Sequence, residues 1–457
     1  MAFKSFKHIA SAVLSAALAV TACVTAVQGE SSSLAAKASK ELYSNTQTFT
    51  GEFGSVDSVV FGRPSSSVLG MSGSFKGTSY YEQLDADSQK VYTAILNEYK
   101  DGMRNGEGIE LIKYLPEMNF KIKGSVSGSS FTPDQESLRM IQDTISGYIT
   151  PAFLAATTDH PELSWISYGS YAFRYGGNSI TPNADGTYSY PISTVLFSVT
   201  TDNIYGTPAE MTSAVSKAKG VIGTQETMYE QVKAIHDYLC NTIDYNYTAL
   251  MPTAGYDAGY YQTAYSAFYR IAQDASTELG MSTDKNLTVC AGYAKSFKIL
   301  CDEYGIPCVY VSGNGINNSG QGEAHAWNYV QMNDGKWYAV DVTWDDQDEI
   351  YYEYFLAGRD TPGFNELTFG QSHVSSGIWS SDSSYEFKYP SLASEAYDPE
   401  EVEITTETTT TEPKLEDTTT EATSTEPKPE DTTPEATTIE PKPEDTTPEV
   451  TTNEPKP

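Results

Sequence analysis

The chain has 457 residues, of which 39% are hydrophobic, enough for two or three compact domains with real cores. Its formal net charge is −33, and the segment from Asp398 to the end contributes −14 through eighteen acidic and four basic residues. The remaining −19 argues against nucleic acid and anionic lipid as partners, because both require clustered Lys and Arg. Such a charge would steer cationic partners such as Lys-bearing peptides, but a solvated acidic surface is the simpler explanation.

Residues 1–26 are typical of an export signal. Two lysines precede an apolar run from Ile9 to Ala22, which is too short to anchor the chain in a bilayer. The letters VTAC ending at Cys23 resemble the lipobox of bacterial lipoproteins, in which this cysteine is lipidated, while ordinary cleavage after Ala22 or Ala26 fits equally well. We therefore expect a secreted or cell-surface protein, which meets a membrane only in the alternative in which Cys23 carries a lipid.

Four cysteines follow the leader: Cys240, Cys290, Cys301 and Cys308. Their spacing does not resemble a disulfide framework, and if one of them is a nucleophile, at least one of the other three is unpaired within the chain. The sequence contains no CxxC or HxH pattern, so we expect no metal site and no cofactor.

The front of the chain divides at about residue 80. Residues 27–79 are rich in Ser, Gly, Ala and Thr with little periodicity, which indicates a flexible lead-in. Residues 80–205 predict a small α+β region: apolar residues recur at helical spacing after Asp85, and the letters TPDQ at 132–135 predict a capping box that opens a second helix. Alternation over 194–200 predicts a strand.

A second folded domain is predicted over 206–395, followed by a tail over 396–457. The letters TPAE at 207–210 form a capping box with proline at the first helical position, and Thr224 is expected to cap the next helix. The tail repeats Pro-Lys every fourteen residues among Thr and Glu, so it can form no apolar face and is expected to be a disordered, extended spacer.

Cys290 opens a stretch with a mostly apolar stripe at helical spacing, which Gly305 and Pro307 terminate. At a helix N-terminus the unpaired backbone N–H groups and the helix dipole favour a thiolate over a thiol. The residue is a candidate nucleophile, and the competing interpretation is a buried structural cysteine.

His325 and Asp341 complete the set of groups that a thiol nucleophile needs, namely a base and a group that orients the base. Around the three candidates the sequence reads VCAGYA at 289–294, HAWN at 325–328 and DVTWDD at 341–346. In this order and with these words, the region of about 220–375 resembles the transglutaminase-like superfamily of papain-type cysteine enzymes. The resemblance implies a papain-like α+β domain in which Cys290, His325 and Asp341 are the catalytic residues.

The turn between the two predicted strands, 325–332 and 336–344, decides whether His325 and Asp341 can meet. A two-residue Asp-Gly loop sends them to opposite faces of the sheet. A three-residue loop with Gly335 in the left-handed region pairs Met332 with Lys336, and it makes His325 and Asp341 diagonal neighbours on one face, about 7–8 Å apart at Cα. A catalytic triad requires the second register, so we predict a positive φ at Gly335.

The predicted activity is acyl transfer through a thioester at Cys290, on protein or peptide amides that include cell-wall peptides. The acceptor is water or an amine, and the triad does not choose between them. The alternative is a surface module with an idle triad that serves adhesion or scaffolding. The backbone N–H of Cys290 is one candidate donor to the oxyanion. The resemblance implies another upstream of the cysteine, an indole N–H as in animal transglutaminases or a glutamine amide as in papain-type proteases, but neither Trp nor Gln stands just before Cys290. His236 is expected to serve packing or capping.

Overall fold

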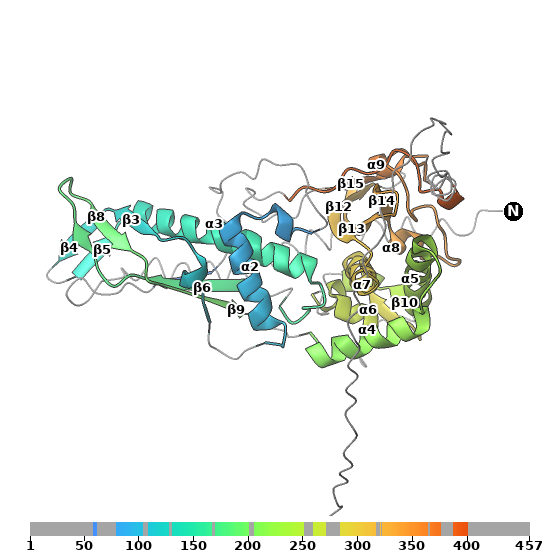
Figure 1. Ribbon diagram of the computed structural model, residues 1–457, viewed down its shortest axis with the longest axis horizontal. Helices are drawn as coiled ribbons and strands as arrows, with labels where there is room; N and C mark the ends of the chain where they lie inside the picture. Colours follow the sequence, from blue (N-terminus) through green and yellow to red (C-terminus); the bar gives the residue numbers. More distant parts are fainter. Residues whose placement is uncertain are drawn as a thin grey trace, which may run out of the picture. The chain divides into compact units, whose positions relative to one another are not determined.

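The computed structural model describes residues 58–61, 79–103, 108–127, 130–166, 170–200, 205–250, 259–270, 284–316, 320, 322–363, 366–375 and 387–400. The leader with Cys23, most of the lead-in and the tail from residue 401 lie outside the described residues, so the expectations for them stay predictions. Within the described part, helices and strands are mixed in an α+β architecture (Figure 1). None of the described helices combines the length and the apolar character that crossing a membrane requires.

The front region combines two long helices with a four-stranded antiparallel sheet of order β1-β6-β9-β2. In Figure 1, α2 crosses α3, against which it packs. Smaller ribbons pair β3 with β8, β8 with β7, and β4 with β5. The helices are α2 (Ala86–Tyr99) and α3 (Gln135–Asp159), with 3-10 turns η1 (Tyr81–Gln83) and η2 (Ile112–Tyr114). The strands are β1 (Ser58–Phe61), β2 (Ile109–Glu110), β3 (Asn119–Ile122), β4 (Gly124–Ser127), β5 (Ser130–Pro133), β6 (Ser170–Gly176), β7 (Thr181–Pro182), β8 (Tyr188–Pro191) and β9 (Thr194–Thr200).

Four expectations for the front of the chain have an outcome. The helix predicted after Asp85 is α2, and the strand predicted over 194–200 is β9, so both predictions are confirmed; the side chain of Asp85 caps α2. The box predicted at 132–135 is wrong in its capping residue, because Asp134 accepts the backbone N–H of Ser137 and caps α3 instead. The lead-in is not wholly irregular, since β1, rich in β-branched valine, pairs with β6.

In the second half of the chain, α5, α6 and α7 pack against a short parallel pair of strands, β10 and β11, and α4 packs on these helices. Thr207 caps α4 as predicted. The cap of α5 is Thr227 and not Thr224, because Thr227 has the glutamate three residues later that completes a capping box, Glu230. The helices are α4 (Pro208–Ile222), α5 (Met228–Thr242), α6 (Ala264–Phe268) and α7 (Cys290–Glu303), the 3-10 turns η3 (Tyr247–Leu250) and η4 (Tyr260–Gln262), and the strands β10 (Ile243–Tyr245) and β11 (Asn286–Thr288).

A four-stranded antiparallel sheet of order β14-β13-β12-β15 packs against α7. Its strands are β12 (Cys308–Ile316), β13 (Gly322–Gln331), β14 (Trp337–Val340) and β15 (His373–Ser375), with the short helices α8 (Val342–Asp345) and α9 (Phe369–Ser372) beside them. The strand predicted over 336–344 is shorter than expected: it ends at Val340, because Asp341 leaves the sheet and caps α8.

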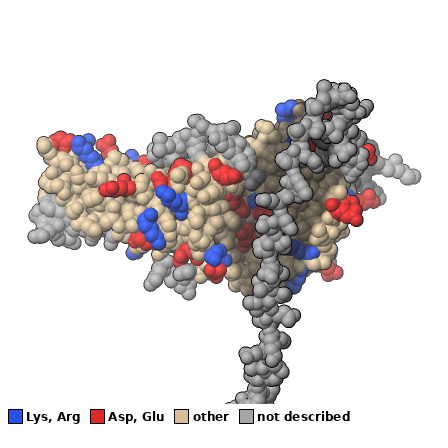
Figure 2. Space-filling view, in the orientation of Figure 1, with Lys and Arg blue, Asp and Glu red and all other residues tan. Residues whose placement is uncertain are grey.

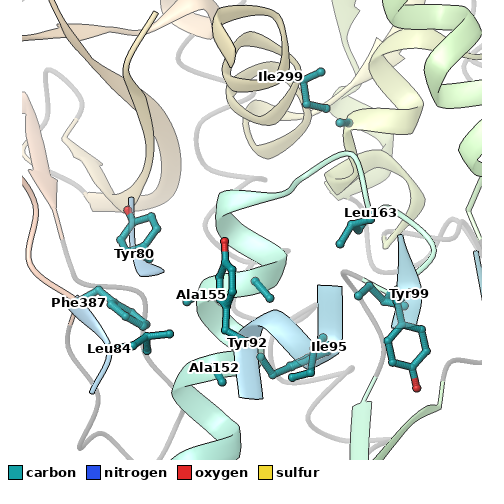
Figure 3. Packing of buried hydrophobic residues seen from close by; sticks show 14 of the residues in the cluster. Tyr80, Leu84, Tyr92, Ile95, Tyr99, Ala152, Ala155, Leu163, Ile299 and Phe387 are labelled. Atoms are coloured by element: carbon teal, nitrogen blue, oxygen red, sulfur yellow. The ribbon is translucent and has the colours of Figure 1, made fainter. Parts of the chain in front are cut away.

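One hydrophobic cluster extends through both halves of the chain. It contains Tyr80, Tyr92 and Ile95 from the front region and Ile299 from α7 (Figure 3). Tyr80 also donates its hydroxyl to the carbonyl of Tyr310 on β12. On the face drawn in Figure 2, basic side chains lie among acidic ones and do not form a single patch.

Candidate active site

Cys290 is the first residue of α7 and is 8% exposed. The strand β11 leads into the helix, and Val289, which precedes it, contributes no side-chain cap. The first N–H groups of a helix have no partner within it, so they are available to an anion at this position. The helix start expected from the sequence is confirmed.

His325 lies on β13 and connects the thiol to a carboxylate. Its Nε2 is 2.6 Å from Oδ2 of Asp341, and its ring stacks on Trp344 with centroids 5.1 Å apart. Burial alone would lower the pKa of His325, but the charge and hydrogen bond of Asp341, together with the neighbouring Cys290 side chain, raise it to about 10. An imidazole this basic is suited to hold the proton that leaves a thiol.

Asp341 is fully buried at the N-cap of α8. Its Oδ1 accepts the backbone N–H groups of Thr343 and Trp344, at 3.0 and 3.2 Å. Its Oδ2 contacts His325 and also His373, the latter at 3.0 Å. Burial would raise the pKa of Asp341, but the two histidines keep it below the usual range, so the carboxylate is ionised.

The hairpin between β13 and β14 has the three-residue loop that a triad requires. Gly335 has φ +78°, and the backbone of Met332 accepts a hydrogen bond from Gly335 and donates one to Lys336. Asn328 lies opposite Val340, so the register runs as expected and brings His325 and Asp341 to one end of the sheet. Both the turn prediction and the predicted proximity of these two side chains are confirmed. Cys290, His325 and Asp341 thus lie together.

Two residues at the site were not among the predicted catalytic residues. His373 starts β15, is 3% exposed, and reaches Asp341 only because β15 pairs with β12. Tyr245 ends β10, pairs with Thr288 just before the nucleophile, and its hydroxyl contacts the Cys290 side chain. Burial, with Cys290 and Tyr247 nearby, raises the pKa of Tyr245, so the phenol keeps its proton. The only sequence signal for Tyr245 was its position upstream of Cys290, where the missing oxyanion donor was expected.

His236 lies in a second buried network below α8. Its Nε2 is 3.3 Å from Asp345, at the end of α8, and its Nδ1 is 3.1 Å from Asp237. Burial would lower the pKa of His236, but the two carboxylates and Cys240 raise it well above the usual value. The residue thus supports the element that carries Asp341, beyond the packing or capping expected for it.

Among the described residues, one group of side chains has the composition of a metal site: His325, Asp341 and His373, with ligand atoms within 4.8 Å of one another. The two nitrogen–oxygen separations are 2.6 and 3.0 Å. Ligand atoms around a tetrahedral zinc ion lie about 3.3 Å apart, so these contacts have the lengths of hydrogen bonds. We therefore describe the group as a hydrogen-bonded network. The four described cysteines are free thiols.

Comparison with known proteins assigns the class of this domain. Residues 215–342 match the model of the transglutaminase-like superfamily, so the chain carries a transglutaminase-like domain, as the sequence words implied. The kyphoscoliosis peptidase of Mus musculus is 30% identical over 126 residues, which are 25% of this chain and 15% of that protein. The protein of the same name from Homo sapiens is 30% identical over 129 residues, or 26% and 16%. The chain thus spans about a sixth of these curated relatives.

Solved structures give distant similarities. The crystal structure of a TGase aligns with a TM-score of 0.21 and 18% identity over 37% of this chain and 44% of its own. The periplasmic domain of TgpA from Pseudomonas aeruginosa aligns with a TM-score of 0.19 and 14% identity, over 38% of this chain and 70% of its own.

Proposed function

We propose that this protein is an exported cysteine acyl-transfer enzyme that forms a thioester between Cys290 and a protein or peptide amide. The supporting observation is the contact chain from Cys290 through His325 to Asp341, in which the Nε2–Oδ2 separation is 2.6 Å. An ionised carboxylate only accepts hydrogen bonds, so Nε2 carries a hydrogen and Nδ1 is the nitrogen free to exchange a proton with the thiol. This tautomer follows from the bonding pattern.

In the proposed mechanism the Cys290 thiolate attacks the amide carbonyl carbon while His325 holds the thiol proton. The carbon–nitrogen bond then breaks, and His325 gives this proton to the leaving amine. Water, which gives hydrolysis, or a second amine, which gives transfer, then attacks the thioester and gives a proton to His325. The carbon–sulfur bond breaks, and the thiolate–imidazolium pair is regenerated in both cases. Asp341 holds the imidazole in position and stabilises its charged form.

Tyr245 supplies the oxyanion donor that was missing from the sequence argument. Its protonated hydroxyl contacts Cys290, so it can donate a hydrogen bond to a carbonyl oxygen under attack there. The backbone N–H of Cys290, at the start of α7, is the second donor in this proposal.

The reaction type is tested by incubating the protein with a glutamine-containing protein and a dansylated amine. Fluorescent product means amine transfer, fragments mean proteolysis, and free ammonia without either means deamidation. Cys290→Ala should abolish each of these, whereas Cys240→Ala, which changes another buried thiol, should not. A wild-type protein that gives no product with any amide, and whose Cys290 reacts no faster than the other thiols, would favour the idle surface module.

A further inference from the structure

The mechanism above uses one of the two imidazoles that contact Asp341. The other, His373, has a fully buried side chain, and its Nε2 lies 3.0 Å from Oδ2 of the same carboxylate. Its ring stacks on Phe369 with centroids 4.0 Å apart and an interplanar angle of 5°, and Trp344 covers it at 4.4 Å. A buried titratable group aimed at the carboxylate of a triad requires a chemical explanation beyond space filling.

The hydrogen atoms in this contact can be assigned. The ionised carboxylate offers only lone pairs, so His373, like His325, must present an N–H at Nε2. Nδ1 of His373 is then an acceptor, and the Ser372 hydroxyl lies 2.9 Å from it. Burial, the largest influence, lowers the pKa of His373; the hydrogen bond and charge of Asp341 and the backbone of Phe369 oppose this shift, and the charge of His325 adds to it. The ring is therefore a neutral donor near neutral pH.

The position of His373 is built into the sheet. Its backbone pairs with Gly315 on β12, and the neighbouring Ser375 pairs with Gly313. A Cβ at Gly313 would lie 2.3 Å from the carbonyl oxygen of Val374, so a glycine is needed for β15 to approach this closely. The titratable or polar side chains that face the ring are Asp341, His325, Ser372 and Tyr354.

We propose that His373 is a positioning residue: it donates Nε2–H to Asp341 and so holds the carboxylate in the orientation that bonds His325. The backbone groups of Thr343 and Trp344 fix Oδ1, and His373 fixes Oδ2, so the carboxylate cannot rotate about its terminal bond. The network then extends from Cys290 through His325 and Asp341 to His373. This inference rests on the proposed function, because it assigns a role within the same site.

Three substitutions separate the hydrogen bond from packing. His373→Phe keeps an aromatic ring and removes the donor, and His373→Asn removes the reach with a smaller side chain. His373→Gln keeps an N–H at about the distance of the imidazole Nε2. Phe369→Leu is the matched control, because it loosens the stacking on the same ring and leaves the donor in place.

The readouts are the pH dependence of Cys290 alkylation by iodoacetamide, followed by mass spectrometry, and the kcat and KM on an amide substrate that the test of reaction type identifies. Without this donor, Asp341 is less well oriented to stabilise the imidazolium of His325, and the imidazolium in turn stabilises the Cys290 thiolate less. His373→Phe and His373→Asn should therefore move the acidic limb of the alkylation profile up by about one pH unit. We expect their kcat to fall by about 10-fold to 100-fold with little change in KM. His373→Gln and Phe369→Leu should stay close to the wild type in both.

The outcomes are distinguishable. If Cys290 of the wild type reacts no faster than the other thiols, the proposed function fails. If it reacts selectively and all variants share one profile, or if His373→Gln behaves as His373→Phe does, only the role of His373 is refuted. Should His373→Phe fail to fold, the comparison of His373→Asn with His373→Gln decides the question.

Discussion

Asp341 shows at the residue scale how a charge can be kept buried at this site. Its four hydrogen-bond donors are two backbone N–H groups at the start of α8 and two imidazoles. Each donor stabilises the ionised form against the cost of burial. The carboxylate can therefore stay charged inside the protein, where its interaction with His325 is little screened by water.

The hydroxyl of Tyr245 gives the first prediction. If it donates to the oxyanion, Tyr245→Phe removes this donor and keeps the ring that packs beside Cys290. We expect kcat to fall by roughly 100-fold, the usual cost of one oxyanion donor, with KM nearly unchanged. Tyr247→Phe is a matched control, since that ring stands 4.8 Å from Tyr245. Equal kcat for Tyr245→Phe and the wild type would remove Tyr245 from the mechanism.

Asp346 gives a prediction on stability and pH. Burial raises its pKa to about 7, although a hydrogen bond from the Tyr293 hydroxyl at 2.5 Å opposes the shift. In the unfolded chain it titrates near pH 3.9, so between about pH 4 and 7 unfolding releases a proton and the free energy of unfolding falls as the pH rises.

Asp346→Asn removes this titration. Relative to the wild type, the variant should gain stability between pH 5 and pH 8 by on the order of 1 kcal/mol or more. Urea denaturation at the two pH values measures the change. If the free energies of unfolding of Asp346→Asn and the wild type differ by the same amount at pH 5 and at pH 8, the pKa of Asp346 is not raised in the folded protein.

At the scale of elements, the β13–β14 hairpin sets the geometry of the site. Gly335 has φ +78°, and a Cβ there would meet nothing within 4 Å, so a substitution costs backbone strain and no steric clash. We expect Gly335→Ala to lower the free energy of unfolding by about 1 kcal/mol, and Gly335→Asn by less, because asparagine tolerates this region better.

The matched control is Gly186, which has φ +81° and equally open surroundings in the front region. Gly186→Ala should cost a similar amount, as measured by thermal unfolding. An alanine at 335 that left the melting temperature unchanged would show that the turn does not need the left-handed conformation.

Local signals explain which elements were predictable. The start of α7 at Cys290 and the register around Gly335 follow from short-range rules on helix ends and turns, and both were predicted. The cap of α5 was placed at Thr224, three residues early, because two threonines compete there and only Thr227 has a glutamate at the third position. Asp341 was placed in a strand because β-branched valines surround it, whereas its side chain ends the strand by capping α8.

The contacts of His373 and Tyr245 could not be read from the sequence in the same way. His373 is 32 residues beyond Asp341 and meets it only through the pairing of β15 with β12. Tyr245 depends on the parallel pairing of β10 with β11. Neither pairing has a turn or a periodic signal, because each joins segments far apart in the chain.

At the scale of the molecule, the front region and the catalytic half share one core. The buried cluster runs from Tyr80 through Ile299 to Phe387, and Tyr80 packs on Phe387 with centroids 5.1 Å apart (Figure 3). The side chain of Gln83 also bonds the backbone of Lys388, 305 residues away. These contacts join the front region to the last described segment, residues 387–400.

We therefore predict a single cooperative unfolding transition, with coincident curves from far-ultraviolet circular dichroism and from tryptophan fluorescence. Tyr80→Phe removes the hydroxyl bonded to Tyr310 and keeps the ring, so it should shift both curves together by about 1 kcal/mol. Two separate transitions, or a shift in one probe alone, would mean that the two halves unfold independently.

The most direct test of the central claim is the alkylation rate of each cysteine in the native protein at pH 6, with and without His325. An activated pair predicts that Cys290 reacts far faster than Cys240, Cys301 and Cys308, and that His325→Ala removes this difference. Equal reactivity of Cys290 in the wild type and in His325→Ala would contradict the account.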